Sequence, residues 1–305
     1  VLIAAVEAGG TSFVVAVVED EAQNIVDQKS IDTKTPAETL PEVVQYFVEY
    51  QKANSCTFDA LGVASFGPVD LNKNSETYGY ITSTPKLAWK NCDILGTIRK
   101  GLGNIATFAF DTDVNGAALA MAIHFSGEQK VDSLAYCTVG TGVGVGILSN
   151  NRLVHGLLHP EAGHVYFPRA EGDSKEEFQG TCPFHGDCLE GLVASASLAK
   201  RKQISAKDLA SIDDNDKLWE IAAFYLAHLC VMLASTVSPQ VIVVGGGIMQ
   251  RTILFQKIRE QATKLTNNYL AIDYHQVIQE SPFGQNAGII GAAALAQQAY
   301  QTKNQ

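Results

Sequence analysis

The chain has 305 residues, of which 46% are hydrophobic and 18% charged, enough for two domains with large buried cores. Its net charge of −10 and pI of about 5.1 argue against partners that are nucleic acid or anionic membrane, because no basic block offsets the acidic excess. We find no apolar run of transmembrane length, and the apolar start, residues 1–6, lacks the basic residues of a signal peptide. The irregularly spaced cysteines do not form a secreted disulfide framework, so we expect a cytoplasmic protein.

The first part of the chain alternates strand and helix patterns. Apolar stretches over residues 2–6 and 13–18 flank a Gly-rich turn and predict a hairpin with backbone N–H groups at its tip. Apolar residues at helical spacing predict a helix over 37–52, and short strands are expected over 61–64 and 105–110. The last of these strands leads through a polar junction into a helix over 116–125.

The same order then begins again. A strand over 133–139 enters a Gly-rich turn and continues in strands over 147–148 and 153–154, which indicates two structurally related halves. The remaining segments comprise a polar loop over 172–180, an apolar helix over 218–235, a strand over 241–244, and helices over 250–269 and 287–300. This alternation predicts an α/β fold. No low-complexity linker marks the boundary, which we place near residues 116–132.

Two domains are therefore expected. The N-terminal α/β domain would span residues 1–117 and be joined by the C-terminal helix 287–303, and the C-terminal α/β domain would span residues 118–286.

A cluster of soft metal ligands lies in the second part of the chain. A C-x2-H-x2-C pattern over residues 182–188 follows a histidine that can complete a four-ligand set. Two thiolates and two imidazoles are what tetrahedral zinc prefers. The predicted zinc ligands are His164, Cys182, His185 and Cys188. Glu161 and Glu190 flank them, so a closed zinc site would fix two carboxylates. The alternative is a buried thiol pair or a disulfide between Cys182 and Cys188.

Three Gly-rich turns each follow a short apolar strand, at residues 7–11, 140–146 and 245–247. Glycine lets backbone N–H groups converge on a phosphate, and Thr11 and Thr141 add hydroxyl donors. A single turn of this kind usually only reverses the chain, but three after strands favour a phosphate site. A Rossmann dehydrogenase and a P-loop enzyme are disfavoured, because neither G-x-G-x-x-G before a helix nor G-x4-G-K-[ST] occurs.

Asp113 lies where a strand gives way to a helix, with Asn115 two residues on. Such an Asp is commonly a helix cap. The functional alternative is a general base that takes a proton from a sugar hydroxyl during phosphoryl transfer, with Mg²⁺ carrying the nucleotide charge.

Together these motifs resemble the ROK family of sugar kinases, within the actin-like ATPase (ribonuclease H-like) fold, over essentially the whole chain. The likeness rests on residues 7–11, Gly67-Pro68, residues 112–115, Gly140-Thr-Gly142, residues 161–164 and Gly245–Gly247. Bacterial fructokinases of the family look the same in residues 65–70, 82–85, 159–164 and 182–188. The resemblance implies duplicated domains with a cleft between them.

The resemblance also implies residue roles. Asp113 would deprotonate the primary hydroxyl of the sugar. The sugar-binding residues would be Gly67, Pro68, Asn115, Glu161, His164 and Glu190. The nucleotide-binding residues would be Gly9, Gly10, Thr11, Thr141, Gly142, Gly245, Gly246 and Gly247. Glu7 would hold Mg²⁺, directly or through water, although the family's first loop usually reads D-x-G-G-T-K and here has Glu7 and Ser12 instead of Asp and Lys.

The resemblance implies ATP-dependent phosphorylation of a hexose at its 6-hydroxyl, with D-fructose to fructose 6-phosphate as the first choice, and with Mg²⁺ and a structural Zn²⁺. Mannose, glucose and N-acetylmannosamine are alternative substrates, and a non-catalytic sugar sensor of the same family is the alternative function. The family often forms dimers, so a homodimer is expected.

Overall fold

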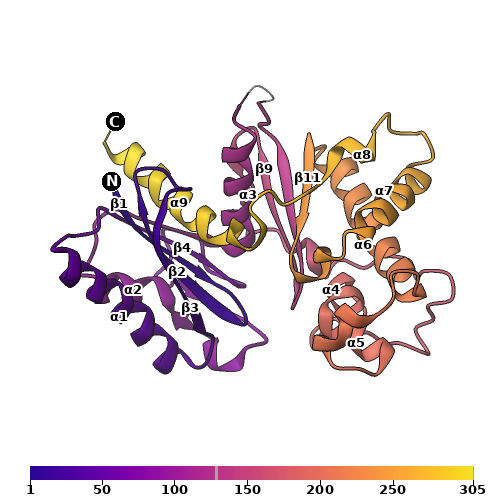
Figure 1. Cartoon of the computed structure of the whole chain (residues 1–305), viewed down its shortest axis with the longest axis horizontal. Coiled ribbons are helices and arrows are strands. Elements are labelled where there is room, and N and C mark those ends of the chain that lie inside the picture. The colour runs from indigo at the N-terminus through magenta and orange to yellow at the C-terminus, as the bar shows by residue number, and fades with distance from the viewer. Residues whose placement is uncertain (128–129, 305) are drawn as a thin grey trace. The chain divides into compact units, whose positions relative to one another are not determined.

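The computed structural model describes residues 1–127 and 130–304. The chain folds into two compact α/β units (Figure 1). Unit 1 contains Val1–His124, Leu153–His159 and the C-terminal segment that starts at Gln285. Unit 2 contains Phe125–Arg152 and Pro160–Gly284. Unit 1 thus takes residues 118–124 and 153–159, which the sequence assigned to the other domain.

The sheet of unit 1 has five strands in the order β3-β2-β1-β4-β7. The strands are β1 (Leu2–Ala8), β2 (Ser12–Glu19), β3 (Ile25–Asp32), β4 (Ala60–Ser65) and β7 (Phe108–Thr112). The first three form an antiparallel meander, and β4 and β7 continue the sheet parallel to β1. The hairpin predicted at the N-terminus is therefore present, and the first Gly-rich turn joins its two strands.

Helices α1 (Pro36–Asn54) and α2 (Ile94–Gly101) cover one face of this sheet. Side chains alternate between the faces of a strand, so Leu61 and Val63 of β4 point into the core beneath these helices. A short ribbon of β5 (Tyr80–Ile81) and β6 (Cys92–Asp93) lies before α2, with the 3₁₀ turn η1 (Leu87–Trp89) between its strands.

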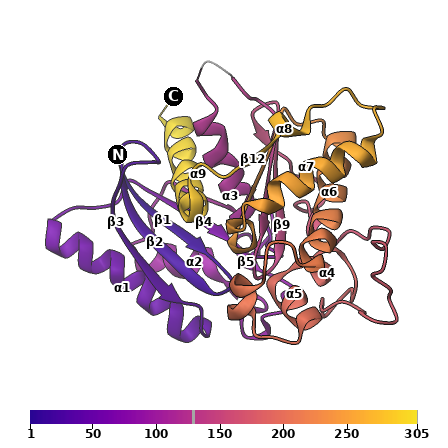
Figure 2. The same cartoon turned by 45° about the vertical axis from the view of Figure 1, so that its right-hand side comes forward.

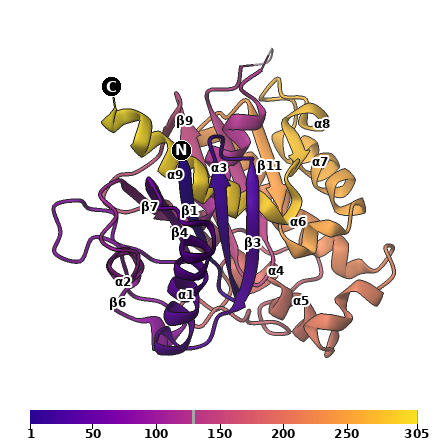
Figure 3. The same ribbon diagram turned by 60° about the vertical axis from the view of Figure 1, so that its left-hand side comes forward.

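Helices α3 (Asp113–His124) and α9 (Ala287–Lys303) pack together on the opposite face (Figure 3). Gly62 of β4 permits the close approach of α9, because a Cβ at Gly62 would lie 1.9 Å from the carbonyl oxygen of Ala292. The C-terminal helix of the chain is thus part of the unit that begins at the N-terminus.

Unit 2 repeats the arrangement with the order β10-β9-β8-β11-β12. Its strands are β8 (Leu134–Val139), β9 (Val143–Ser149), β10 (Arg152–Leu153), β11 (Val241–Gly245) and β12 (Ile278–Glu280). As in unit 1, a hairpin is extended by strands parallel to its first strand. The predicted duplication of an α/β topology is therefore confirmed.

The helices of unit 2 are α4 (Leu189–Val193), α5 (Ser195–Lys202), α6 (Lys217–Thr236), α7 (Ile253–Thr266) and α8 (Tyr274–Val277). Helix α7 packs beside α6 (Figure 2). Short 3₁₀ turns comprise η2 (Ala162–His164), η3 (Ala206–Ser211), η4 (Gly247–Gln250) and η5 (Gly284–Asn286), which begins at the last residue of unit 2.

Helix α6 corrects one sequence expectation. We found no apolar run of membrane-spanning length, but α6 is long and apolar enough to cross a membrane by length and composition. Of its apolar window, 61% is buried within the protein, including Trp219 and Tyr225, so α6 is a core helix of unit 2.

Candidate functional site

The four predicted metal ligands lie together in unit 2. Turn η2 supplies His164, and the loop before α4 supplies Cys182, His185 and Cys188. Their ligand atoms all lie within 4.8 Å of one another. The Nδ1 atoms of His164 and His185 are 3.3 Å apart, and His164 Nδ1 lies 3.8 Å from Cys182 Sγ and 3.5 Å from Cys188 Sγ.

These separations suit tetrahedral zinc. Zn–N bonds of about 2.0 Å and Zn–S bonds of about 2.3 Å place neighbouring ligand atoms roughly 3.3–3.8 Å apart. Cys182 and Cys188 are free thiols, so the disulfide alternative is not what the structure contains. Burial raises the pKa of Cys188 to about 12 and lowers the pKa of His164. His164 is therefore a neutral imidazole, and the Cys188 thiol would lose its proton to a bound metal.

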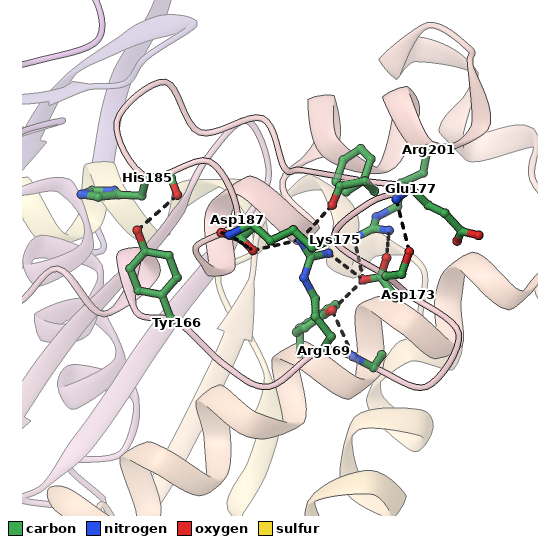
Figure 4. A network of polar contacts seen from close by, with 12 residues as sticks. Tyr166, Arg169, Asp173, Lys175, Glu177, His185, Asp187 and Arg201 are labelled. Atoms are coloured by element: carbon green, nitrogen blue, oxygen red, sulfur yellow. Dashed lines mark hydrogen bonds and ion pairs between the residues drawn. The ribbon is translucent and has the colours of Figure 1, made fainter.

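Backbone hydrogen bonds shape the ligand loop. Cys182 and Gly186 exchange N–H···O bonds of 3.1 and 2.9 Å, and the hydroxyl of Tyr166 donates to the carbonyl of His185 at 3.2 Å (Figure 4). Turn η2 lies tightly on β9, because a Cβ at Gly163 would sit 1.8 Å from the carbonyl oxygen of Val143. The ligand positions are thus built into the fold of the loop.

An ion-pair network also holds the metal-ligand loop in place (Figure 4). Arg169 donates hydrogen bonds to Asp187 at 3.0 Å and to Asp173 at 3.3 Å. Arg201 donates two hydrogen bonds to Asp173, of 2.5 and 3.0 Å. Tyr225 donates to the same carboxylate at 2.6 Å. Burial alone would raise the pKa of Asp173, but the hydrogen bonds from Arg201 and Tyr225 outweigh it and hold that pKa below its usual value. Because Asp187 adjoins the last ligand, the network fixes the ligand loop against α5 and α6.

Glu161 and Glu190 flank the cluster as expected. Glu161 is exposed, and its Oε2 lies 4.0 Å from Nε2 of His164, the ring nitrogen that faces away from the cluster. Glu190 Oε2 accepts a hydrogen bond from the backbone N–H of Val143 at 3.0 Å, beside Gly142. Glu190 thus links the metal-ligand loop to the second Gly-rich turn.

The second and third Gly-rich turns are neighbours in unit 2. They follow the parallel strands β8 and β11, whose carboxyl ends lie at the same edge of the sheet. A Cβ at Gly140 would lie 3.5 Å from the backbone nitrogen of Gly247. Ser195 holds the second turn by donating from its backbone N–H and its hydroxyl to the carbonyl of Gly140 at 2.8 and 2.9 Å. Thr141 is exposed at this turn.

In unit 1 the first Gly-rich turn joins β1 to β2. Gly9 N–H donates to the carbonyl of Ser12 at 3.0 Å, and Thr11 is exposed at the tip. A Cβ at Gly10 would lie 3.3 Å from Cε of Lys86, so the end of this lysine side chain reaches the turn. Lys86 is not among the predicted site residues, because it lies in the loop before η1, far from this turn in the chain.

Glu7 precedes this turn at the end of β1. Burial and the negative charge of Asp113 raise the pKa of Glu7 to about 8, although a hydrogen bond from the backbone of Ile289 opposes them. Its Oε2 atom is buried and has no hydrogen-bond partner within residues 1–127 and 130–304. At neutral pH this carboxyl therefore mostly carries a proton, and a cation or a cation-bound water at the unpartnered oxygen would replace that proton.

Asp113 is the first residue of α3, directly after β7. The cap of this helix is Thr112, whose hydroxyl accepts from the backbone N–H of Asn115 at 3.1 Å. The Asp113 carboxylate accepts from the adjacent backbone N–H of Val114 at 2.8 Å, and its own backbone N–H also lies against it. Burial raises the pKa of Asp113 to about 6, with backbone hydrogen bonds opposing the shift. The carboxylate is therefore not needed as the cap and is poised to exchange a proton near neutral pH.

The remaining predicted residues of unit 1 lie in two places. Asn115 is 1% exposed, and its carboxamide contacts Asp111 and His155. Gly67 and Pro68 form a turn after β4, where the next backbone N–H, that of Val69, donates to Nε2 of His159 at 3.1 Å. We had not assigned roles to either histidine.

Residues 3–299 match the ROK family. The chain belongs to this family. Among its relatives, the fructokinase of Streptococcus mutans is 40% identical over 297 residues, covering 97% of each chain. The fructokinase of Zymomonas mobilis is 38% identical over 295 residues, covering 95% of each chain. The ROK hexokinase of Thermus thermophilus has the same fold, with a TM-score of 0.76, 20% identity and full coverage of both chains. The family resemblance and the α/β fold predicted from the sequence are thus confirmed.

Proposed function

We propose that this ROK protein is an ATP-dependent sugar kinase that transfers the terminal phosphoryl group to the 6-hydroxyl of a hexose. The substrate we assign is D-fructose, and the product is fructose 6-phosphate. The near-full-length similarity to bacterial fructokinases supports this choice. The observation that carries the reaction type is Asp113, a carboxylate with a pKa of about 6 at the start of α3, whose capping function Thr112 already fulfils.

In this reaction Asp113 accepts the proton of the attacking hydroxyl as the oxygen bonds to phosphorus. Phosphoryl transfer depends mainly on position and charge neutralisation, so a base near neutral pKa is adequate. The sugar ligands we propose are Gly67, Pro68, Asn115, Glu161, His164 and Glu190. Nε2 of His164 faces Glu161, which supports a hydroxyl-binding role for this pair.

Nucleotide phosphates are assigned to Gly9, Gly10 and Thr11 in unit 1 and to Thr141 and Gly142 in unit 2, with Gly245, Gly246 and Gly247 against adenosine. The first turn has Ser12 instead of the family's usual Lys. We assign the missing positive charge to Lys86, whose side chain reaches Gly10.

The residues present fit both metals. His164, Cys182, His185 and Cys188 would hold Zn²⁺ as a structural ion, since all four ligand positions come from protein. Glu7 would hold Mg²⁺ directly or through water, and its unpartnered buried oxygen supports this role. Mg²⁺ would neutralise phosphate charge. The protein's own contribution is to fix the carboxylate of Glu7 against the start of α9.

We also propose that the protein works in the cytoplasm as a homodimer. Its cysteines are free thiols in every case, which suits a reducing compartment. Sedimentation at micromolar concentration should give twice the chain mass of 32.7 kDa. A single species with the mass of one chain would contradict the dimer.

A coupled ADP-release assay with D-fructose, D-mannose, D-glucose and N-acetylmannosamine tests the proposal. We expect the highest kcat/KM with fructose and release at no more than about 10⁻² of the wild-type rate from the Asp113→Asn variant. The altered first turn, with Ser12, is the observation that favours a non-catalytic sugar sensor. Binding of a hexose by calorimetry, without ADP release for any of the four sugars, would establish that alternative.

A further inference from the structure

Residues 153–159 form a short segment that joins unit 1 although the chain on both sides of it belongs to unit 2. The segment brings two histidines to elements of unit 1 that are far away in sequence. His155 contacts the junction between β7 and α3, and His159 contacts the turn after β4. Leu157 and Leu158 between them are exposed, so this middle part of the segment contributes no apolar anchor, and the two histidines make its contacts to unit 1.

The contact of His155 has a defined proton arrangement. Nε2 of His155 lies 2.9 Å from Oδ2 of Asp111, and Nδ2 of Asn115 lies 2.6 Å from Oδ1 of the same carboxylate. A carboxylate only accepts, so both nitrogens carry the protons. The approach of Asn115 Nδ2 to His155 Nε2 at 3.3 Å is therefore a contact between donors, not a third hydrogen bond. The hydrogen bond from His155 to Asp111 also raises the pKa of His155.

Asp111 connects this contact to the start of α3. Its Oδ1 also accepts from the backbone N–H of Thr112 at 2.8 Å, and Thr112 in turn caps the helix. Asp111 is 4% exposed, so its charge is shielded from water and depends on these donors. Removing His155 takes away the hydrogen bond to Oδ2 of this nearly buried carboxylate. Asp111 is then held only through Oδ1, by Thr112 and Asn115, so the change falls on the residues that precede and follow Asp113 at the start of α3.

His159 contacts a second segment that we assign to sugar binding, the turn at Gly67 and Pro68. Its Nε2 accepts from the backbone N–H of Val69, so the ring is neutral at that nitrogen. A Cβ at Gly67 would lie 3.5 Å from Cε1 of His159. The buried imidazole thus supports the Gly67–Pro68 turn from one side.

We infer that His155 and His159 are positioning residues of the phosphoryl transfer. His155, through Asp111, sets the geometry of the base-carrying start of α3, and His159 sets the geometry of the sugar-binding turn. The inference rests on the proposed kinase function. Neither histidine needs to touch substrate, and their effects fall on different kinetic constants.

Steady-state kinetics of four variants test this inference. His155→Leu should lower kcat about 10–100-fold with the KM for fructose within about twofold, because a misplaced base slows chemistry more than binding. His159→Leu should raise the KM for fructose about tenfold, since the turn loses its support. His155→Gln and His159→Gln keep a donor or an acceptor near the imidazole Nε2 position and should recover most of the loss. His275→Leu, at an exposed histidine of α8 in unit 2, is the matched control and should match the wild type.

Asp111→Asn, a change of equal size, provides a second test. Its loss of kcat should not add to that of His155→Leu in the double variant, because both act through one contact. Additive losses, unchanged kcat in His155→Leu, or equal losses in the Leu and Gln variants would overturn the inference. Absence of activity in the wild type would instead refute the proposed function, so the two failures are distinguishable.

Discussion

The rate of sugar phosphorylation should fall as the pH is lowered through about 6, because Asp113 must be ionised to accept a proton. Burial raises the pKa of this carboxyl to about 6. A raised pKa means that the carboxylate takes up its proton at a higher pH than an ordinary Asp. The base is therefore available above pH 6 and is lost progressively below it.

The size of the effect follows from the pKa. With a pKa of about 6, roughly ten elevenths of the protein carries ionised Asp113 at pH 7 and roughly one eleventh at pH 5. The value of kcat/KM for fructose should thus fall about tenfold between pH 7 and pH 5. An Asp with an ordinary pKa of about 3.9 would give a decrease of less than about 10% over the same range.

Initial rates in a direct ADP assay, at saturating Mg²⁺ and ATP, measure this profile. Zinc content and circular dichroism at each pH control for loss of the metal cluster, whose ligands also bind protons. Asp113→Asn should retain about 10⁻² to 10⁻⁴ of the activity and show no inflection near pH 6. A flat wild-type profile down to pH 5 in folded, zinc-loaded protein would refute Asp113 as the base.

Three further predictions concern metal, charge and packing. Cys188→Ser should reduce the zinc content, measured by elemental analysis, from about one ion per chain to near zero. Cys56→Ser, the control, should keep its zinc. Wild-type protein without zinc would contradict the proposed zinc site. Glu7→Gln should lower kcat at least about tenfold and weaken its dependence on Mg²⁺; a silent change would place metal binding elsewhere. Gly62→Ala should lower the free energy of unfolding by about 1–3 kcal/mol, because the new methyl meets the carbonyl of Ala292; an unchanged urea midpoint would contradict this packing.

Much of the fold could be predicted from apolar periodicity. The hairpin β1–β2, the strand β11 and the helices α1 and α6 were found close to their observed bounds. Strand β3 was missed because most of its side chains are exposed at the edge of the sheet, so no alternation of apolar residues marks it. Helix α2 was missed because its eight residues hardly exceed two turns.

The candidate site likewise contains residues that could be predicted from the sequence and residues that could not. The metal ligands were predictable because three of them lie within seven positions of the sequence, and the structure brings the fourth to them. Lys86, Asp111 and His155 were missed because their relevance depends on contacts between segments far apart in the chain. His159 was visible only as part of a family motif, and nothing in the sequence relates it to the backbone of Val69.

Identification of the reaction product is the most direct test of the proposed kinase reaction. The protein, loaded with zinc and Mg²⁺, would be incubated with ATP and D-fructose, and the products followed by ³¹P nuclear magnetic resonance. We expect stoichiometric ADP and a single phosphomonoester on the 6-oxygen from the wild type, formed at no more than about 10⁻² of that rate by Asp113→Asn. No sugar phosphate from fructose or any other hexose, in protein that binds the sugar, would contradict the kinase function.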